Sequence, residues 1–366
     1  MLHFNEGKFK ILVIADIQDD VTASPYTTEF IATAIDSEKP DLIVLNGDNI
    51  QGSAPSLLLS KSAVKRSIDQ FLAPIVERGI PFAVVFGNHD AETIMSKEEQ
   101  MEYYLSFDNC LARPNAIGRS VGNYNLLIKG QQDEPSLNLW FFDSNNRIYS
   151  EYGYGYAYVT NEQIEWYERT AKETQNSNGG AVVPAFVFQH IPVPEIYDLL
   201  TEVPKSTNGA VRGHGKWKNQ FFVINPELVE SGSMGEGPCP PDFNNGQFDS
   251  WLKQGDVVAA FFGHDHVNDF AGNLKGIDLA YTPGAGFYSY GNGYKRGVRV
   301  IEIDQNNPSK YVSRLIYYSD LIDEPIPDSL LHNGETRLLI LQWVLILIVL
   351  LALLSVAAFF LVRKMI

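Results

Sequence analysis

The chain has 366 residues, of which 45% are hydrophobic and 20% charged, a composition that excludes a disordered or low-complexity protein. Its 28 basic and 44 acidic residues give a formal charge of −16, which argues against an extended nucleic-acid surface, since that needs clustered Lys and Arg. The two cysteines, Cys110 and Cys239, form no CxxC pair, which excludes a zinc-thiolate site and a dithiol redox site.

Short apolar runs alternate with helical patterns along most of the chain, which favours an α/β fold. Buried strands are predicted, in chain order, over 9–15, 42–45, 82–86, 137–142, 185–188 and 257–262. Helices are predicted between them, over 28–37, 62–78, 96–109 and 161–175. After residue 263 the pattern turns to strands, predicted over 277–281, 297–303 and 311–318. Two Gly-rich segments, 149–158 and 201–249, are predicted to be long surface loops, which are often functional or mobile.

The last part of the chain is almost purely apolar. Residues 338–362 carry no charge, and as a helix they would be about 37 Å long at about 1.5 Å per residue, enough to cross a hydrocarbon core of roughly 30 Å. We therefore predict a transmembrane helix over 338–362, with Trp343 near one end and a short basic tail, 363–366, at the other. A buried core helix is the alternative, but soluble helices rarely run this long without a polar face.

The remainder is predicted to be one domain, residues 1–319, and a linker to the membrane, residues 320–337, because no composition break divides the domain. The first residues lack the basic start and apolar stretch of a secretion signal. We therefore expect a single-pass protein anchored by its C-terminal helix, with a cytosolic domain. The flanking basic residues, Arg337 before the apolar segment and Arg363 and Lys364 after it, do not decide the topology.

Polar side chains stand where five of the predicted strands end. In chain order these are Asp16 and Gln18, then Asp48, then Asn88, His89 and Asp90, then His190, and finally His264, Asp265 and His266. In α/β sheets the ligand crevice lies outside the carboxyl ends of the strands, so these side chains should meet at one rim. Singly, Asp48 or Asn88 could serve a turn, and His190 could be a structural histidine. The pair His264-x-His266 is less ambiguous, because imidazoles two apart on an extended segment point the same way.

This combination of side chains indicates a metal site. Carboxylate, carboxamide and imidazole ligands without thiolate suit ions such as Mn, Fe or Zn. A short carboxylate such as Asp48 can bridge two ions about 3.5–4 Å apart, and such a pair can turn a bridging water into hydroxide and clamp an anionic substrate. That chemistry indicates hydrolysis of a phosphate ester.

As an ordered set, the strand-end motifs resemble those of the calcineurin-like metallophosphoesterase superfamily. The motifs are Asp16-x-Gln18, Gly47-Asp48, Gly87-Asn88-His89-Asp90, His190 and Gly263-His264-Asp265-His266. The run 263–270 and the opening 2–18 resemble its intracellular-type branch, which is related to purple acid phosphatases. The resemblance covers residues 2–318. It implies a four-layer αββα sandwich of two mixed sheets, two divalent metal ions (Mn, Fe or Zn), and a phosphomonoester or phosphodiester substrate, nucleotides included.

Carried over motif by motif, the resemblance implies two metal sites that share Asp48. One would be formed by Asp16, Gln18, Asp48 and His266, and the other by Asp48, Asn88, His190 and His264. His89 would contact the phosphate and protonate the leaving oxygen, and Asp90 would orient His89. The substrate-binding candidates are Asn88, His89, Tyr288 and Tyr290. The two tyrosines lie in a loop that resembles a substrate-side loop of this branch, but they could equally only pack that loop.

Two positions depart from the family's pattern. Gln18 stands where an imidazole is usual and offers a weaker, neutral oxygen donor. Gln51 stands where purple phosphatases carry a tyrosinate, so we expect no purple charge-transfer band. Two functions follow: a membrane-anchored metal-dependent phosphoesterase, or a membrane-anchored binding or scaffold protein that has lost turnover through Gln18. The presence of every other motif residue favours the enzyme.

Overall fold

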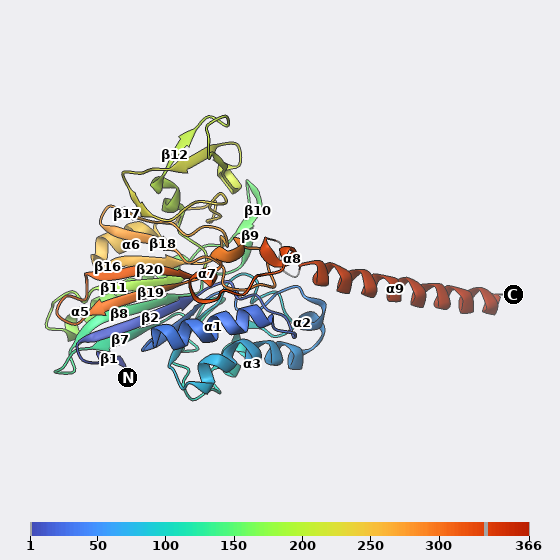
Figure 1. Cartoon of the computed structure of the whole chain (residues 1–366), viewed down its shortest axis with the longest axis horizontal. Helices are drawn as coiled ribbons and strands as arrows, with labels where there is room; N and C mark the ends of the chain where they lie inside the picture. Colours follow the sequence, from blue (N-terminus) through green and yellow to red (C-terminus); the bar gives the residue numbers. More distant parts are fainter. Residues whose placement is uncertain (1, 333–335, 366) are drawn as a thin grey trace.

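Two mixed β-sheets lie face to face in the middle of the protein (Figure 1). The computed structural model describes residues 2–332 and 336–365. The larger sheet has the strand order β1 (Leu2–His3), β7 (Tyr124–Lys129), β8 (Pro135–Phe142), β11 (Ala185–Gln189), β16 (Val257–Phe262), β18 (Ile277–Tyr281), β17 (Ala271–Leu274), β15 (Val229–Ser231). The smaller sheet has the order β20 (Tyr311–Tyr317), β19 (Gly297–Asp304), β2 (Lys8–Ile14), β3 (Leu42–Asn46), β4 (Phe82–Val85). Parallel pairing of β3 with β2 and β4, and of β11 with β8 and β16, brings their carboxyl ends to one edge of each sheet.

Helices cover both outer faces of this pair of sheets. α1 (Pro25–Glu38) and α3 (Lys61–Glu77) lie against the smaller sheet, and α5 (Asn161–Ser177) and α6 (Gln247–Gln254) against the larger one. Shorter elements between the strands are α2 (Pro55–Leu59), α4 (Lys97–Tyr104), β5 (Ala116–Ile117), β6 (Ser120–Val121), and the 3₁₀ helices η1 (Pro194–Leu199), η2 (Gly215–Trp217) and η3 (Gly293–Lys295). The predicted four-layer αββα sandwich is therefore confirmed.

The apolar runs that predicted the strands are explained by burial on both faces. In β11, Phe186 and Phe188 belong to the core between the sheets, whereas Ala185 and Val187 belong to the core that includes residues of α5 and α6. Successive side chains of a strand point to opposite faces, so a strand of a middle layer is apolar at every position. The strands β7 and β17, which were not predicted, instead alternate buried with half-buried residues.

One predicted helix is too long. The helix expected over 96–109 ends at Tyr104. Beyond it, the Asn109 side-chain amide donates to the Ile80 carbonyl at 2.5 Å, and the Phe82 amide donates to the Asn109 carbonyl at 2.9 Å. The chain therefore leaves the helix because Asn109 pairs with the segment that leads into β4.

The two segments predicted as long loops contain strands. Within or beside 149–158, β9 (Arg147–Ser150) and β10 (Gly153–Tyr156) form an antiparallel hairpin. Within 201–249, β12 (Leu200–Val203), β14 (Phe221–Ile224) and β13 (Val211–Arg212) form a small sheet that stands apart from the two main ones (Figure 1). Both segments therefore contain paired strands and are not irregular loops.

The prediction of a linker over 320–337 is wrong for most of that segment, because the residues up to 332 pack on the domain. It contains α7 (Tyr318–Leu321) and α8 (Asp328–Leu331), and Ile322 and Ile326 are buried in the core. The amide of Ile326 donates to the Tyr294 hydroxyl at 3.1 Å, and Arg296 Nη2 donates to the Leu330 carbonyl at 3.4 Å. The domain therefore continues to about residue 332. Residues 333–335 of the predicted linker lie outside the described residues.

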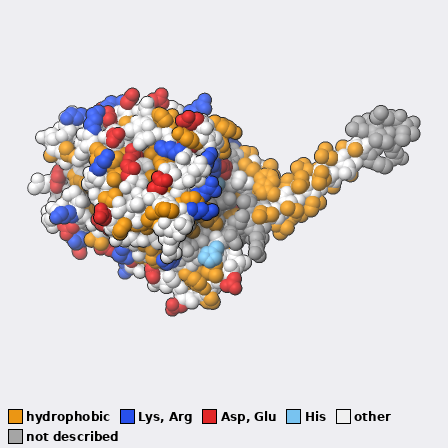
Figure 2. Space-filling view, turned by 90° about the horizontal axis from the view of Figure 1, so that it is seen from above, with side chains coloured by type: hydrophobic (Ala, Val, Ile, Leu, Met, Phe, Trp, Pro, Cys, Tyr) orange, Lys and Arg blue, Asp and Glu red, His pale blue; other side chains and the backbone are white. Residues whose placement is uncertain are grey.

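The C-terminal helix α9 (Thr336–Met365) projects away from the domain (Figure 1). Its stretch Ile340–Ala358 has a mean hydropathy of 2.8, with none of it buried inside the protein, and it is long enough to cross a membrane. Figure 2 shows this hydrophobic surface outside the domain. The side chains of Arg337, Arg363 and Lys364 lie outside the described ones. Near its start, Gln342 Nε2 donates to Asp20 Oδ2 at 3.4 Å.

Candidate metal centre

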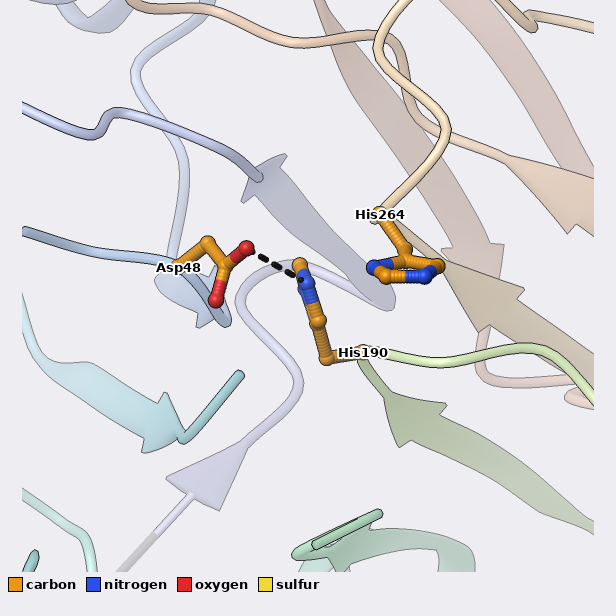
Figure 3. Close-up of side chains that lie close together, drawn as sticks. All are labelled: Asp48, His190 and His264. Carbon is orange, nitrogen blue, oxygen red and sulfur yellow. Dashed lines mark ion pairs between the residues drawn. The ribbon is translucent and has the colours of Figure 1, made fainter. Parts of the chain in front are cut away.

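The ends of five strands bring the predicted ligands together at one rim. β2 leads into Asp16 and Gln18, and β3 into Asp48, while β4, β11 and β16 lead into Asn88, His190 and His264-x-His266, respectively. Figure 3 shows Asp48, His190 and His264 converging, and their ligand atoms lie within 4.8 Å of one another. His190 Nε2 lies 3.1 Å from Asp48 Oδ2.

A second pair of ligand atoms lies beside this group. His266 Nε2 is 3.2 Å from Asp16 Oδ1, and Asp16 Oδ1 is in turn 3.8 Å from His190 Nε2. Asp16 also accepts a hydrogen bond from the His264 backbone amide at 2.9 Å, and so ties the ends of β2 and β16 together. Asp16 therefore adjoins the group formed by Asp48, His190 and His264.

The backbone around these ligands is strained. Asp16, Gln18, Asp48 and His264 have φ values of 53°, 45°, 49° and 77°, in the left-handed region that non-glycine residues seldom adopt. Such conformations cost about 1–3 kcal/mol each and persist only where the surroundings hold them. The strain points these side chains into the rim, and it is typical of functional sites.

Gly47 and Gly87 have no side chain where the candidate ligands lie. A Cβ atom at Gly87 would collide with the Asp48 carboxylate and backbone amide, and one at Gly47, where φ is +90°, would collide with the His190 ring. Any side chain at either position would therefore displace a ligand.

The donor atoms at the rim fit metal ions. Asn88 Oδ1 and His264 Nε2 are buried and have no hydrogen-bond partner among the described residues. Asp16 Oδ1 and His190 Nε2 are also buried, and they lie in ion pairs with His266 and Asp48, respectively. A buried polar atom without a partner costs about 1–3 kcal/mol, so the two unpaired atoms, on Asn88 and His264, call for an occupant. Oxygen and imidazole donors without thiolate are the ligands that Mn, Fe and Zn accept.

The imidazoles are oriented by the backbone. His190 Nδ1 is 3.0 Å from the Asn46 carbonyl, and His266 Nδ1 is 2.9 Å from the Tyr290 carbonyl. A proton on each Nδ1 donates to that carbonyl, which leaves Nε2 with its lone pair toward the rim.

The electrostatics of the rim favour positive charge. Burial lowers the pKa of His190, but the carboxylates of Asp48 and Asp16 outweigh it and raise this pKa to about 10. Burial raises the pKa of Asp48, but the imidazoles of His190 and His89 outweigh it and hold this pKa well below its usual range. The carboxylates that draw a proton onto His190 would draw a metal cation in its place.

Gln18 lies beside the Asp48 carboxylate. Its side chain is buried, and its Nε2 donates to Asp48 Oδ2 at 3.0 Å. In this arrangement the amide is a hydrogen-bond donor to a ligand, whereas an imidazole at the same position would bind an ion directly.

His89 is the half-buried member of the rim. Its Nε2 is 4.0 Å from Asp48 Oδ2, and its Nδ1 is 2.7 Å from Glu92 Oε2. Burial lowers the pKa of His89, but Asp48 and Glu92 outweigh it and raise this pKa above its ordinary value. The carboxylate that contacts the ring is therefore that of Glu92.

The expected role of Asp90 is corrected by the structure. Asp90 does not orient His89; its carboxylate accepts the backbone amides of Gly87 at 2.7 Å, Asn49 at 3.0 Å and Ile50 at 3.3 Å. Burial and the charge of Asp48 raise the pKa of Asp90 to about 7. Asp90 instead holds the loops after β3 and β4 together.

The two tyrosines predicted to bind substrate have different surroundings. Tyr288 is only 2% exposed, so neither face of its ring is open for stacking. Its hydroxyl donates to Asp20 Oδ2 at 3.4 Å. Tyr290 stacks on the His266 ring with centroids 4.1 Å apart, and its hydroxyl donates to Glu236. Tyr288 therefore packs the loop, and Tyr290 supports a candidate ligand.

Three residues of the rim were not predicted: Glu92, Arg147 and Tyr156. Arg147 lies with its Nε 3.8 Å from Glu92 Oε1 and its guanidinium 4.5 Å from the Tyr156 ring centroid. The Tyr156 ring meets the His264 ring edge-on, with the two ring centroids 4.2 Å apart. Arg147 follows the end of β8, so the strand-end rule applied to that strand could have found it.

Comparisons with known proteins identify the family of this chain. The family model for calcineurin-like phosphoesterases matches residues 9–268. The chain is 35% identical to the probable inactive purple acid phosphatase 14 of Arabidopsis thaliana, over 82% of this chain and 77% of the relative. It is 32% identical to the probable inactive purple acid phosphatase 29 of the same plant, over 83% and 79%.

A solved structure shares the fold. GAP50, the anchor in the inner membrane complex of Plasmodium, superimposes with a TM-score of 0.50 at 12% identity, over 92% of this chain and 94% of that one. The family model covers well over half of the present chain, and its match includes both the strand ends and the candidate ligands. The chain therefore belongs to the calcineurin-like phosphoesterase family.

Proposed function

We propose that this protein is a metal-dependent phosphoesterase with a dinuclear centre at the rim of its two sheets. The observation that carries the proposal is the buried group of Asp48, His190 and His264, whose ligand atoms lie within 4.8 Å of one another, beside the pair of Asp16 and His266. Asp16, Asp48 and His266, with Gln18 beside them, would hold one ion. Asp48, Asn88, His190 and His264 would hold the other.

When bound, such ions supply a water-derived nucleophile at neutral pH and neutralise the charge of the phosphate. The chain's own residues complete the reaction. His89 is 27% exposed, and its Nε2 would give a proton to the departing alcohol oxygen. Glu92, at 2.7 Å from Nδ1, holds the ring in the orientation that presents Nε2.

Arg147 would bind the phosphate oxygens on the same side. Its guanidinium lies between Glu92 and Tyr156, and its side chain is 24% exposed. A guanidinium can donate two parallel hydrogen bonds to a phosphate, which fixes orientation as well as charge.

The second candidate function is a binding or scaffold protein without turnover. It is favoured by one observation: the Gln18 amide donates to Asp48 Oδ2 and offers no imidazole to the first ion. The relatives compared above carry "probable inactive" in their names. The intact second ligand group and the placement of His89 and Glu92 favour the enzyme.

We also propose that α9 anchors the domain to a membrane, with the domain on the cytosolic side. Support comes from the exposed apolar stretch Ile340–Ala358. Deleting residues 338–366 is expected to release the protein from membranes, as measured by flotation on a density gradient. A protein that still floats with lipid after this deletion would contradict the anchor.

Metal titration of the purified protein tests the two functions. We expect binding of two ions per chain and hydrolysis of an aryl phosphate that rises with added Mn²⁺. A panel of phosphomonoesters, phosphodiesters and nucleotides would then establish the preference. Full loading with two ions but no hydrolysis of any substrate would support the scaffold function instead.

A further inference from the structure

A cavity of about 420 Å³ lies beside the metal rim, between the β9–β10 hairpin and the insertion 201–249. Five aromatic side chains line it: Tyr149, Tyr152, Tyr156, Tyr158 and Phe243. Its charged lining residues are Lys216, Glu151 and Asp242. The aromatic rings dominate the walls, and the single cation is outnumbered by carboxylates.

The wall of the cavity is built rather than accidental. Asp242 accepts the Lys216 backbone amide at 2.6 Å and the Ser150 hydroxyl at 3.2 Å, and so joins the insertion to the hairpin. A Cβ atom at Gly215, where φ is +53°, would collide with the Asp242 carboxylate. Tyr158 and Phe243 pack with ring centroids 5.0 Å apart across the same junction.

The cavity adjoins the position at which an alcohol would depart. Tyr156 is shared, because its ring both lines the cavity and lies 4.2 Å from the ring of His264. Arg147, at the base of the same hairpin, contacts Tyr156 and Glu92, and Glu92 contacts His89. These contacts link the candidate proton donor, His89, to the hairpin through Glu92 and Arg147.

We infer that this cavity is a leaving-group subsite for a planar, uncharged ring, so that the substrate is a phosphate ester of an alcohol carrying such a ring. The inference rests on the proposed function of the rim. Tyrosine and phenylalanine faces attract flat rings by stacking and edge-to-face packing. The lining has no excess of positive charge among the described residues, which disfavours alcohols that carry further phosphates. A nucleobase and an aryl group share this chemistry.

Binding of two phosphonates to the full-length, metal-loaded protein in detergent micelles tests the inference independently of turnover. Ethylphosphonate and 2-phenylethylphosphonate differ only by the ring, and neither can be hydrolysed at a P–O ester bond. We expect the ring compound to bind about 3- to 10-fold more tightly by calorimetry, the range given by one or two aromatic contacts. Phe243→Ala and Tyr152→Ala should each remove most of that ratio.

Val312→Ala is the control, since Val312 is an exposed apolar residue on β20 that does not line the cavity. It should leave the ratio as in the wild type. Equal affinity for the two phosphonates, or a ratio that survives both substitutions, would overturn the subsite whether or not the protein turns over.

Turnover of ethyl phosphate, 2-phenylethyl phosphate and adenosine 5′-monophosphate identifies the source of the ring. A KM that rises on Phe243→Ala for the nucleotide alone assigns a nucleobase, and one that rises for the phenylethyl ester alone assigns an aryl group. Tight, ring-dependent phosphonate binding without hydrolysis of any of the three supports the subsite and contradicts the proposed enzyme.

Discussion

The metal rim and the β9–β10 hairpin lie side by side but are built in opposite ways. At the rim, Asp48 is 1% exposed and His190 is fully buried, and the loops are joined by hydrogen bonds from strand end to strand end. On the hairpin, Tyr149 is 82% exposed and Tyr154 is 60% exposed. The rim is thus a buried scaffold shared by several strands, whereas the hairpin is an exposed element, and we propose that the first supplies the chemistry and the second the choice of substrate. Substitutions should therefore separate metal loading and chemistry from substrate choice.

The sharpest test of the rim is Asp48→Asn. We expect loss of activity and a lower metal content, because the same carboxylate would serve both ions and an amide carries no charge. Metal analysis after dialysis, with an aryl phosphate assay, measures both. Asp69→Asn, at a carboxylate on α3 that accepts the Tyr103 hydroxyl, is the control and should change neither. Two ions per chain and normal turnover in Asp48→Asn would contradict the dinuclear centre.

His89→Ala should keep the metals and lower kcat by about 10²–10⁴-fold, the usual effect of removing a general acid. The loss should be larger for alkyl esters than for aryl esters, because good leaving groups need no proton. The ratio of the two kcat values is the measurement. A uniform loss for both ester types would mean that His89 acts in some other way.

Arg147→Ala should lower kcat/KM by about 10- to 100-fold, the range expected when one charge-assisted contact to phosphate is lost. Metal content should not change, because among the described residues the link from Arg147 to a candidate ligand is indirect. Arg147 contacts the Tyr156 ring, and that ring contacts His264. Arg147→Lys should recover the charge but not the two-pronged geometry, and therefore only part of the activity. If Arg147→Ala instead strips the metals, the hairpin supports the rim and the contrast between the two regions fails.

Gln18→His should have the smallest effect. An imidazole binds a divalent ion more strongly than a neutral amide oxygen, so the first ion should be held more tightly and the second unchanged. Bound metal counted after dialysis, and activity as a function of added Mn²⁺, compare the two forms. Should the wild type already retain two ions and Gln18→His bind no more tightly, Gln18 is an adequate ligand or is replaced by another residue.

The sequence by itself determined the strands of the middle layers and the residues at their ends. Strands covered on both faces must be apolar at every position, so β3 and β11 are legible as runs, and Asp48 and His190 stand directly after them. The ordered set of strand ends then identified the family, and the long apolar stretch marked the candidate membrane helix. These features are local, because each depends on residues close together in the chain.

Only the tertiary structure decided which side chains meet. The partner of His89 is Glu92 rather than Asp90, because the Asp90 carboxylate is held by backbone amides of two loops. Burial of Ile322 joins the presumed linker to the domain, and Arg147 reaches the rim from a hairpin that looked like a loop. Each of these outcomes depends on contacts between segments far apart in the chain, which no local pattern of residue types encodes.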